Sequence, residues 1–167
     1  MTEEKAAPKS KSILVVGGGI SGLTSAIEAA ELGYEVFLIE KEASIGGRVA
    51  QLNKYFPKLC PPTCGLEINY RRIKDNPNIK VLTLTEVEKV EGTPGNYEVT
   101  LKISPRYIND NTTCLDELID SLETEIPNEH NFGMNTTKGL FLPHEMAFPF
   151  KYAISPKVIG TDRKSVV

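Results

Sequence analysis

An α/β fold built around a parallel β-sheet is predicted by three features of the N-terminal part of the chain. The apolar run Ile13–Val16 is short, β-branched and uninterrupted, as expected for a strand buried on both faces of a parallel sheet. A glycine-rich turn follows it, and apolar residues between Ile20 and Ala30 then recur at spacings of three and four, which gives a helix one apolar face. A second apolar run at 36–39 completes a strand–helix–strand unit.

The turn after the first strand carries the spacing G-x-G-x-x-G at Gly17, Gly19 and Gly22. Gly17 permits a tight turn, Gly19 lets the backbone approach a pyrophosphate, and Gly22 allows close packing of the helix on the sheet. The helix start, at Ile20 and Ser21, directs N–H groups and the positive end of the helix dipole at phosphate. Glycine triples occur in ordinary turns, but strand, turn, helix and second strand follow here in order, so the sequence predicts a dinucleotide site.

An acidic residue, Glu40, ends the second strand about 20 residues after the glycines, where its carboxylate can accept hydrogen bonds from a ribose diol. The same charge would repel the 2′-phosphate of NADP, so NADP is disfavoured. We include the next residue, Lys41, among those predicted to bind the cofactor. Spacing alone does not say which dinucleotide is bound.

Composition limits the other classes of function. The chain has 167 residues, which suits one domain, and a net charge of −3, which does not favour nucleic acid or an anionic membrane surface as a partner. It lacks an apolar run of about 18 residues, so no membrane-spanning helix is predicted. Residues 1–10 are polar and indicate a disordered tail rather than a secretory signal. Three cysteines without such a signal favour a reducing cytoplasm over a disulfide framework.

The rest of the chain continues the α/β pattern as far as residue 104. Residues 49–56 suit either a short helix or a loop, and residues 125–161 show little periodicity. The other predicted elements are a helix over 66–74, a third parallel strand over 79–84, a hairpin over 86–104 that turns at 92–96, and a helix over 113–122 with Thr113 as its cap.

A second glycine motif, Gly46-Gly47-Arg48, follows the acid-ending strand. This combination resembles the two-dinucleotide-binding flavoproteins of the glutathione-reductase-like class. The resemblance implies a Rossmann-like FAD/NAD(P)-binding domain with FAD as cofactor, in which a parallel sheet is accompanied by an antiparallel β-meander. In that class the glycine pair passes close to FAD and the arginine, here Arg48, supports the loop.

Two further motifs, C-P-P-T-C-G at 60–65 and P-R-Y-I at 105–108, narrow the resemblance. With the glycine motifs they resemble the flavin-carrying A subunit of heterodisulfide reductase, and most of all the A subunit of the quinone-interacting membrane-bound oxidoreductase. This resemblance implies an electron-transfer subunit that passes electrons between membrane quinone and adenylylsulfate reductase during sulfate reduction. The other subunits of the complex would then touch the membrane, and this chain would be cytoplasmic and peripheral to the inner membrane.

The sequence departs from this family at two places. Heterodisulfide reductase subunits follow the P-R-Y segment with a four-cysteine run that binds a four-iron cluster, whereas here Cys114 stands alone. An iron–sulfur cluster is therefore expected only in the full complex. The missing cysteines also make the sequence resemble the quinone-interacting relative more than heterodisulfide reductase. The segment that closes the FAD domain in this class is also missing. Because residues 162–167 read like a translated sequencing adapter, we expect native sequence to stop near Thr161 and the 11–161 domain to be incomplete.

The cysteine pair leaves three roles open. Cys60 and Cys64 could form a redox dithiol, supply two cluster ligands or be structural thiols, and no catalytic residue is assigned beyond these candidates. We interpret Cys114 as a small buried hydrophobe. His130 and His144 lack a second ligand at metal spacing, so we expect them on the surface or in the core, and no metal site is predicted.

Two other functions remain as alternatives to a flavin-binding redox subunit. One is a flavin-less Rossmann scaffold subunit that positions electron carriers. The other is an independent NAD-linked reductase, which would need a second G-x-G-x-x-G unit that these residues lack.

Overall fold

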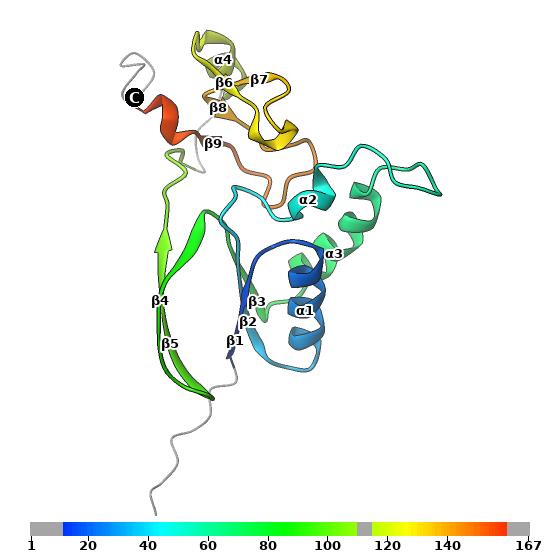
Figure 1. Cartoon of the computed structure of the whole chain (residues 1–167), viewed down its shortest axis with the longest axis vertical. Helices are drawn as coiled ribbons and strands as arrows, with labels where there is room; N and C mark the ends of the chain where they lie inside the picture. The colour runs from blue at the N-terminus through cyan, green and yellow to red at the C-terminus, as the bar shows by residue number, and fades with distance from the viewer. Residues whose placement is uncertain (1–11, 110–114, 160–167) are drawn as a thin grey trace, which may run out of the picture.

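A three-stranded parallel sheet is the centre of the molecule, in a computed structural model that describes residues 12–109 and 115–159 (Figure 1). Its order is β1–β2–β3, and the strands are β1 Ser12–Val16, β2 Glu35–Ile39 and β3 Ile79–Leu82. The register places Val16 opposite Ile39 and Ile39 opposite Leu82. The carboxyl ends of all three strands therefore meet at one edge, where open α/β sheets bind their ligands.

Two helices, α1 Ile20–Glu31 and α3 Thr63–Asp75, cover the same face of this sheet (Figure 1). Their apolar sides form the core with alternate residues of the strands; the buried members from the helices are Leu23, Ala26, Ile27, Ala30, Leu66, Tyr70 and Ile73. Gly33 follows the end of α1 with a φ of +90°, a left-handed conformation that commonly ends a helix. Among the helices of the described residues, none combines the length and the hydrophobicity needed to traverse a bilayer.

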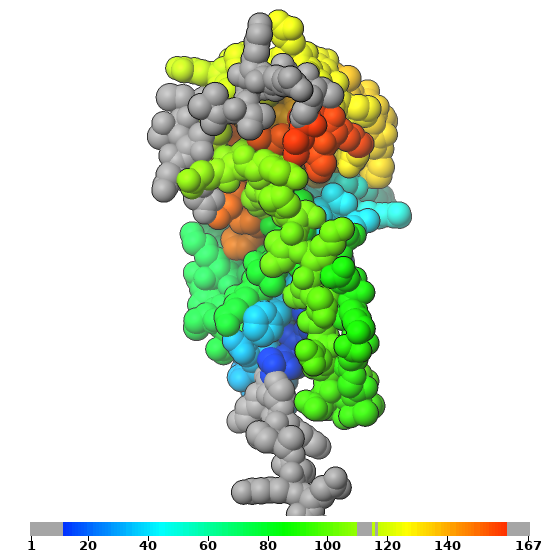
Figure 2. Space-filling view, turned by 90° about the vertical axis from the view of Figure 1, so that its left-hand side faces the viewer, coloured from blue at the N-terminus to red at the C-terminus, as the bar shows by residue number. Residues whose placement is uncertain are grey.

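The predicted hairpin is confirmed as β4 Thr85–Thr93 and β5 Asn96–Ile103, with a register shift between Val87 and Lys89. It lies on the side of the sheet opposite to the helices (Figure 1). Figure 2 shows it in green along the outside of the molecule, below the yellow and orange C-terminal part. The third parallel strand ends at Leu82 rather than Leu84, because Leu84 has a φ of +55° and turns the chain into the hairpin.

Residues 115–159 form a smaller unit beyond the carboxyl edge of the sheet (Figure 1). The stretch predicted to lack periodicity contains two short antiparallel pairs, whose strands of two or three residues are too short for a visible alternation. The elements are α4 Leu115–Ser121, β6 Glu125–Pro127, the 3₁₀ turn η1 Glu129–Asn131, β7 Thr136–Lys138, β8 Leu140–Phe141, β9 Ala153–Ile154 and the 3₁₀ turn η2 Pro156–Val158.

Three differences from the sequence-based expectations concern burial and boundaries. β1 is only partly buried, and Val16 is 66% exposed, because within the described residues β1 pairs with β2 alone. Helix α3 begins at Thr63, so Cys64 lies in the helix rather than in the preceding turn. The short helix α2, Gly47–Ala50, precedes a loop. The predicted tail, the cap at Thr113, Cys114 and residues 162–167 lie outside the described residues.

Candidate nucleotide-binding site

The first glycine turn leaves open space where a ligand could approach the backbone. Gly17 has a φ of +100° and donates from its N–H to the Ile39 carbonyl oxygen at 2.8 Å, which fixes the turn to the end of β2. A Cβ at Gly22 would lie 1.9 Å from the Gly17 carbonyl oxygen, so helix α1 starts in direct contact with the turn. By contrast, a Cβ at Gly19 would meet no protein atom within 4 Å. The turn is therefore tight on its protein side and open at Gly19.

The carboxylate of Glu40 lies at the mouth of this turn. One oxygen, Oε2, accepts a hydrogen bond of 2.6 Å from the Gly18 N–H, and Oε1 accepts one of 3.0 Å from the Glu42 N–H. Glu40 is 8% exposed, so these bonds compensate the burial of its charge. A carboxylate has about four acceptor positions, and two partners leave capacity for a ribose diol.

The second glycine motif lies against the first. The Gly46 N–H donates to the Gly18 carbonyl oxygen at 2.7 Å, and a Cβ at Gly47 would come within 3.0 Å of the Gly19 Cα. Both glycines of the pair have positive φ, +117° at Gly46 and +55° at Gly47. The two motifs therefore form one backbone surface at the carboxyl end of the sheet.

Two aromatic residues hold the second motif in place. The Tyr70 hydroxyl of helix α3 donates to the Ile45 carbonyl oxygen at 2.9 Å, and the Ile45 N–H donates to the Phe148 carbonyl oxygen at 2.9 Å. The rings of Tyr70 and Phe148 stack with centroids 5.5 Å apart. Burial raises the pKa of Tyr70 to about 12, so the hydroxyl remains a donor. Tyr70 falls within the helix predicted over 66–74, and nothing in the sequence indicated this role.

Arg106 connects three separate segments around the site. Its guanidinium donates to the Ala43 carbonyl oxygen, to Thr83 Oγ1 and to the Lys151 carbonyl oxygen. These partners follow β2, follow β3 and precede β9, respectively. In the sequence, Arg106 stood out only as a member of the P-R-Y-I motif. No neighbouring residue indicated that its side chain links the sheet to the C-terminal part.

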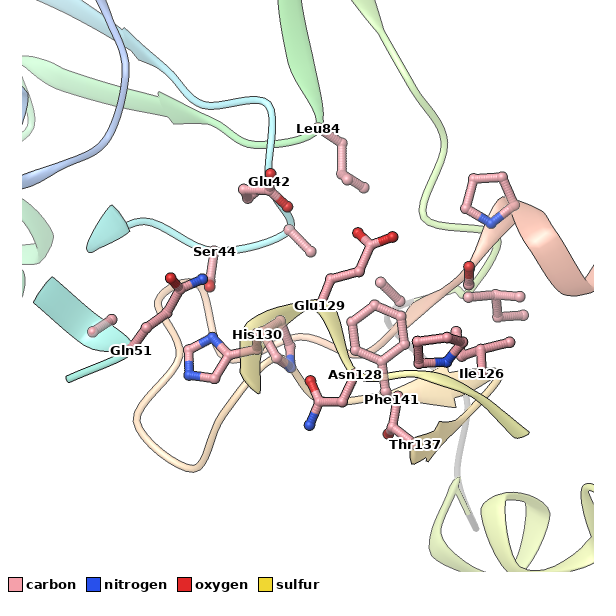
Figure 3. Close-up of a pocket in the computed structure, with 18 of the residues that line it drawn as sticks. Glu42, Ser44, Gln51, Leu84, Ile126, Asn128, Glu129, His130, Thr137 and Phe141 are labelled. Atoms are coloured by element: carbon pink, nitrogen blue, oxygen red, sulfur yellow. The ribbon is translucent and has the colours of Figure 1, made fainter. Parts of the chain in front are cut away.

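A cavity of about 240 Å³ adjoins the second glycine motif. Residues 42–51 form one side of it and residues 126–156 most of the other. In Figure 3, Glu42, Leu84 and Glu129 lie along one side, and Gln51 and His130 along another. Burial raises the pKa of Glu42; the Lys41 charge opposes this shift, and the Glu40 and Glu129 carboxylates add to it. The cavity therefore has an acidic rim beside Gly47.

Two histidines that were expected on the surface or in the core are stacked on each other, and one of them, His130, lines the cavity. The rings of His130 and His144 have centroids 4.9 Å apart and an interplanar angle of 20°. The buried Nε2 of His144 has no hydrogen-bond partner in the part of the chain that the structure describes. Burial lowers the pKa of His130, and burial together with the His130 charge lowers that of His144 to about 4. Both imidazoles are therefore neutral at pH 7.

The remaining predicted cofactor residues are exposed. Ile20 and Ser21 form the first turn of α1 beside the open space at Gly19. Lys41 lies 3.9 Å from the Glu42 carboxylate, and Arg48 lies in α2 with an exposed side chain. These residues surround the glycine surface, and the structure assigns no contact that fixes their role.

The cysteine pair lies around the start of α3: Cys60 precedes the helix and Cys64 is in its first turn. Cys60 is partly exposed, Cys64 is exposed, and both are free thiols. A hydrogen bond with the Cys60 side chain raises the pKa of Tyr55. Within residues 12–109 and 115–159, no group of three or more His, Cys, Asp or Glu side chains is arranged to hold a metal ion.

Comparison with known proteins identifies a family model and a solved structure that each match part of the chain. Residues 15–81 match the family model of the NAD(P)-binding Rossmann-like domain. Among solved structures, thioredoxin reductase from T. acidophilum gives a TM-score of 0.44 at 20% identity, over 56% of this chain and 31% of that one.

Two curated relatives from methanogens cover most of the chain. The iron-sulfur A subunit of CoB–CoM heterodisulfide reductase from Methanocaldococcus jannaschii is 40% identical over 148 residues, which are 86% of this chain and 22% of that protein. The A subunit of the H(2)/formate:CoB-CoM heterodisulfide,ferredoxin reductase from Methanococcus maripaludis is 36% identical over 155 residues, 90% of this chain and 23% of that protein. The chain thus spans under a quarter of the length of either relative. Its homologues are A subunits of heterodisulfide reductases, and its fold is that of a Rossmann-like nucleotide-binding domain.

Proposed function

We propose that this chain binds FAD and is the flavin-binding part of an electron-transfer oxidoreductase subunit. The observation that carries the proposal is the single surface formed by both glycine motifs and the Glu40 carboxylate at the carboxyl end of the sheet. Gly19 and Gly47 approach each other there without side chains, beside the start of α1. Such a surface suits a pyrophosphate next to a ribose.

Each group of residues has a defined part in this proposal. Gly17, Gly19 and Gly22, with the N–H groups of Ile20 and Ser21, would bind the pyrophosphate, and Glu40 would accept from the ribose hydroxyls. The other proposed cofactor contacts come from Lys41, Gly46, Gly47 and Arg48. A bound flavin would supply the electron-transfer chemistry, and these residues would bind and orient it. The open space at Gly19 fits this requirement, since an added Cβ there meets no protein atom within 4 Å.

Titration of the purified 167-residue chain with FAD, NAD and NADP tests the proposal. We expect FAD to bind most tightly, as measured by quenching of its fluorescence, and NADP least, because the Glu40 charge faces any 2′-phosphate. Tighter binding of NAD than of FAD would contradict the proposal and favour an NAD-linked module. The flavin-less scaffold is tested on the full-length protein, whose visible spectrum would then lack the absorption of bound oxidised flavin at roughly 450 nm.

We propose further that the chain acts with other subunits of a membrane-associated redox complex, at the cytoplasmic side of the inner membrane. Its relatives are subunits of heterodisulfide reductases, which supports a multi-subunit context. The solitary Cys114 in place of a four-cysteine run favours the quinone-interacting relative over a heterodisulfide reductase-type subunit. Reduction of the flavin by a quinol analogue in the isolated complex, followed by transfer to adenylylsulfate reductase, is the expected outcome; flavin that a quinol analogue cannot reduce would count against it.

The cysteine pair is proposed to take part in electron transfer, as a dithiol or as ligands of a cluster present only in the complex. Iron, labile-sulfide and flavin-reduction measurements on the complex with Cys60→Ser and Cys64→Ser distinguish these roles. Loss of iron and sulfide indicates ligands, and slower flavin reduction at unchanged iron content indicates a dithiol. Unchanged values for both would leave the thiols with a structural role.

A further inference from the structure

The cavity beside Gly47 has a wall that the proposed pyrophosphate site does not use. His130 lines this wall, and its ring is supported from behind by the ring of His144 at a centroid distance of 4.9 Å. In Figure 3 the His130 imidazole lies next to Gln51, which follows α2 directly. The cavity therefore adjoins the second glycine motif and is lined at another point by the imidazole of His130.

The charges around this cavity exclude an anion. Its lining contains two carboxylates, Glu42 and Glu129, and no lysine or arginine among the described residues. Lys157 forms an ion pair with Glu129 at 2.5 Å, but its side chain does not line the cavity. Because the lowered pKa values keep both imidazoles neutral at pH 7, the pair supplies no positive charge. Although Lys157 compensates the charge of Glu129, a phosphate placed here would face the Glu42 carboxylate with no lysine or arginine among the described lining residues.

The same lining suits a flat, uncharged ring that carries polar edge atoms. Apolar side chains can pack on the faces of such a ring, while carboxylates and a neutral imidazole accept or donate hydrogen bonds at its edge. The apolar members are Ile45, Ala50, Leu84, Ile126, Phe141 and Ile154. His130 supplies the imidazole of this lining, and His144, which stacks on it, does not itself line the cavity.

We propose that this cavity binds an uncharged heteroaromatic ring and that His130, held by its stack on His144, is the residue that positions the edge of the ring. The inference rests on the proposed function in one respect, that the ring belongs to the dinucleotide bound at the glycine surface. Adenine and isoalloxazine share the required chemistry, a planar uncharged ring with N–H donors and nitrogen acceptors. The experiment below separates these two sources.

Nuclear magnetic resonance of the imidazoles tests the inference directly, because the chain contains only two histidines. The ¹⁵N-labelled chain is titrated with FAD, riboflavin, adenosine and inorganic phosphate. We expect FAD and one of the two ring compounds to shift the imidazole signals, and the compound that does so identifies the ring. The pKa values of both histidines should stay below the ordinary value in the complex. A rise in the pKa of either histidine on addition of phosphate would overturn the inference, because it would show that an anion binds beside the imidazoles.

Variants add a second readout. We expect His130→Gln to weaken binding of the active ring compound about tenfold, as for loss of one hydrogen bond, and His144→Gln to weaken it less. Lys102→Gln, on the exposed strand β5, is the control and should bind as the unaltered chain does. Equal affinity of His130→Gln and the unaltered chain would overturn the positioning role.

The outcomes separate this inference from the proposed function. If FAD binds and both histidine signals stay unchanged, the inference is wrong and the proposed function stands. If FAD fails to bind while riboflavin or adenosine shifts the histidines, the proposed function fails and the ring site stands. If no ring compound shifts them and FAD does not bind, both fail.

Discussion

The hydroxyl of Tyr70 donates a hydrogen bond of 2.9 Å to the carbonyl oxygen of Ile45, which precedes the second glycine motif directly. This bond connects helix α3 to the loop that carries the motif, and the Ile45 N–H is bound in turn by Phe148. A Cβ at Gly46 would lie 2.4 Å from the same hydroxyl oxygen. The conformation of the second motif therefore depends on contacts with residues far from it in sequence.

Tyr70→Phe should lower the free energy of unfolding by about 1 kcal/mol, the usual net contribution of a buried hydrogen bond. The ring and its stack on Phe148 remain, so the loss reports the hydroxyl alone. Urea unfolding measures it, and Tyr97→Phe, at a tyrosine that is 59% exposed, is the matched control. Equal losses for the two variants would show that the bond to Ile45 does not stabilise the fold.

Glu40→Gln should destabilise the chain by about 1–3 kcal/mol, because the buried carboxylate accepts from two backbone N–H groups. An amide keeps one acceptor oxygen but presents an NH₂ group to the second N–H. FAD affinity should fall at the same time, since the charged acceptor for the ribose is lost. Glu98→Gln on the exposed strand β5 provides the control for stability and for FAD binding. Unchanged FAD affinity in a folded Glu40→Gln variant would remove Glu40 from the site.

Gly22→Ala and Gly19→Ala should separate packing from ligand binding. The Gly22 methyl group would overlap the Gly17 carbonyl oxygen at 1.9 Å, so we expect a loss of about 2–3 kcal/mol, as for overpacking in a core. The Gly19 methyl group meets no protein atom, and its φ of −73° is allowed for alanine. Gly19→Ala should therefore stay folded, within about 1 kcal/mol, and still lose FAD affinity. Full FAD binding by Gly19→Ala would contradict a pyrophosphate at this turn.

The parallel sheet, its covering helices and the hairpin could be predicted because each has a pattern within its own residues. The apolar run of β1, the three-to-four spacing in α1 and the alternation in β5 are local signals. β6 to β9 could not be predicted, since strands of two or three residues are too short for an alternating pattern to stand out from chance. Their pairing depends on long-range contacts.

Each glycine motif could be recognised from spacing, but their contact could not. The approach of Gly47 to Gly19 follows from how the chain after β2 folds back over the first turn. The stack of His130 on His144 was missed for a similar reason, because His130 lies in a single 3₁₀ turn and His144 in an irregular segment, so no sequence period relates the two residues. Arg106 shows the same limit, since its three partners are distant in sequence.

His144→Asn should make stability less dependent on pH between 6.5 and 4. Burial and the His130 charge lower the pKa of His144 in the folded chain to about 4, below its ordinary value of 6.5. The unfolded chain therefore binds this proton first as pH falls, so the folded state loses stability from about pH 6.5 down to about pH 4. Asparagine cannot take up the proton, so the His144→Asn variant does not show this part of the stability loss at low pH.

Thermal unfolding at a series of pH values measures the difference between His144→Asn and the unaltered chain. Taking this difference at each pH cancels other titrating groups, such as Glu42, whose raised pKa acts in the opposite direction. We expect the variant to gain relative stability as pH falls through this range, whatever its stability at pH 7. The reasoning fails if both proteins lose stability in parallel, because the His144 imidazole would then titrate equally in the folded and unfolded chains.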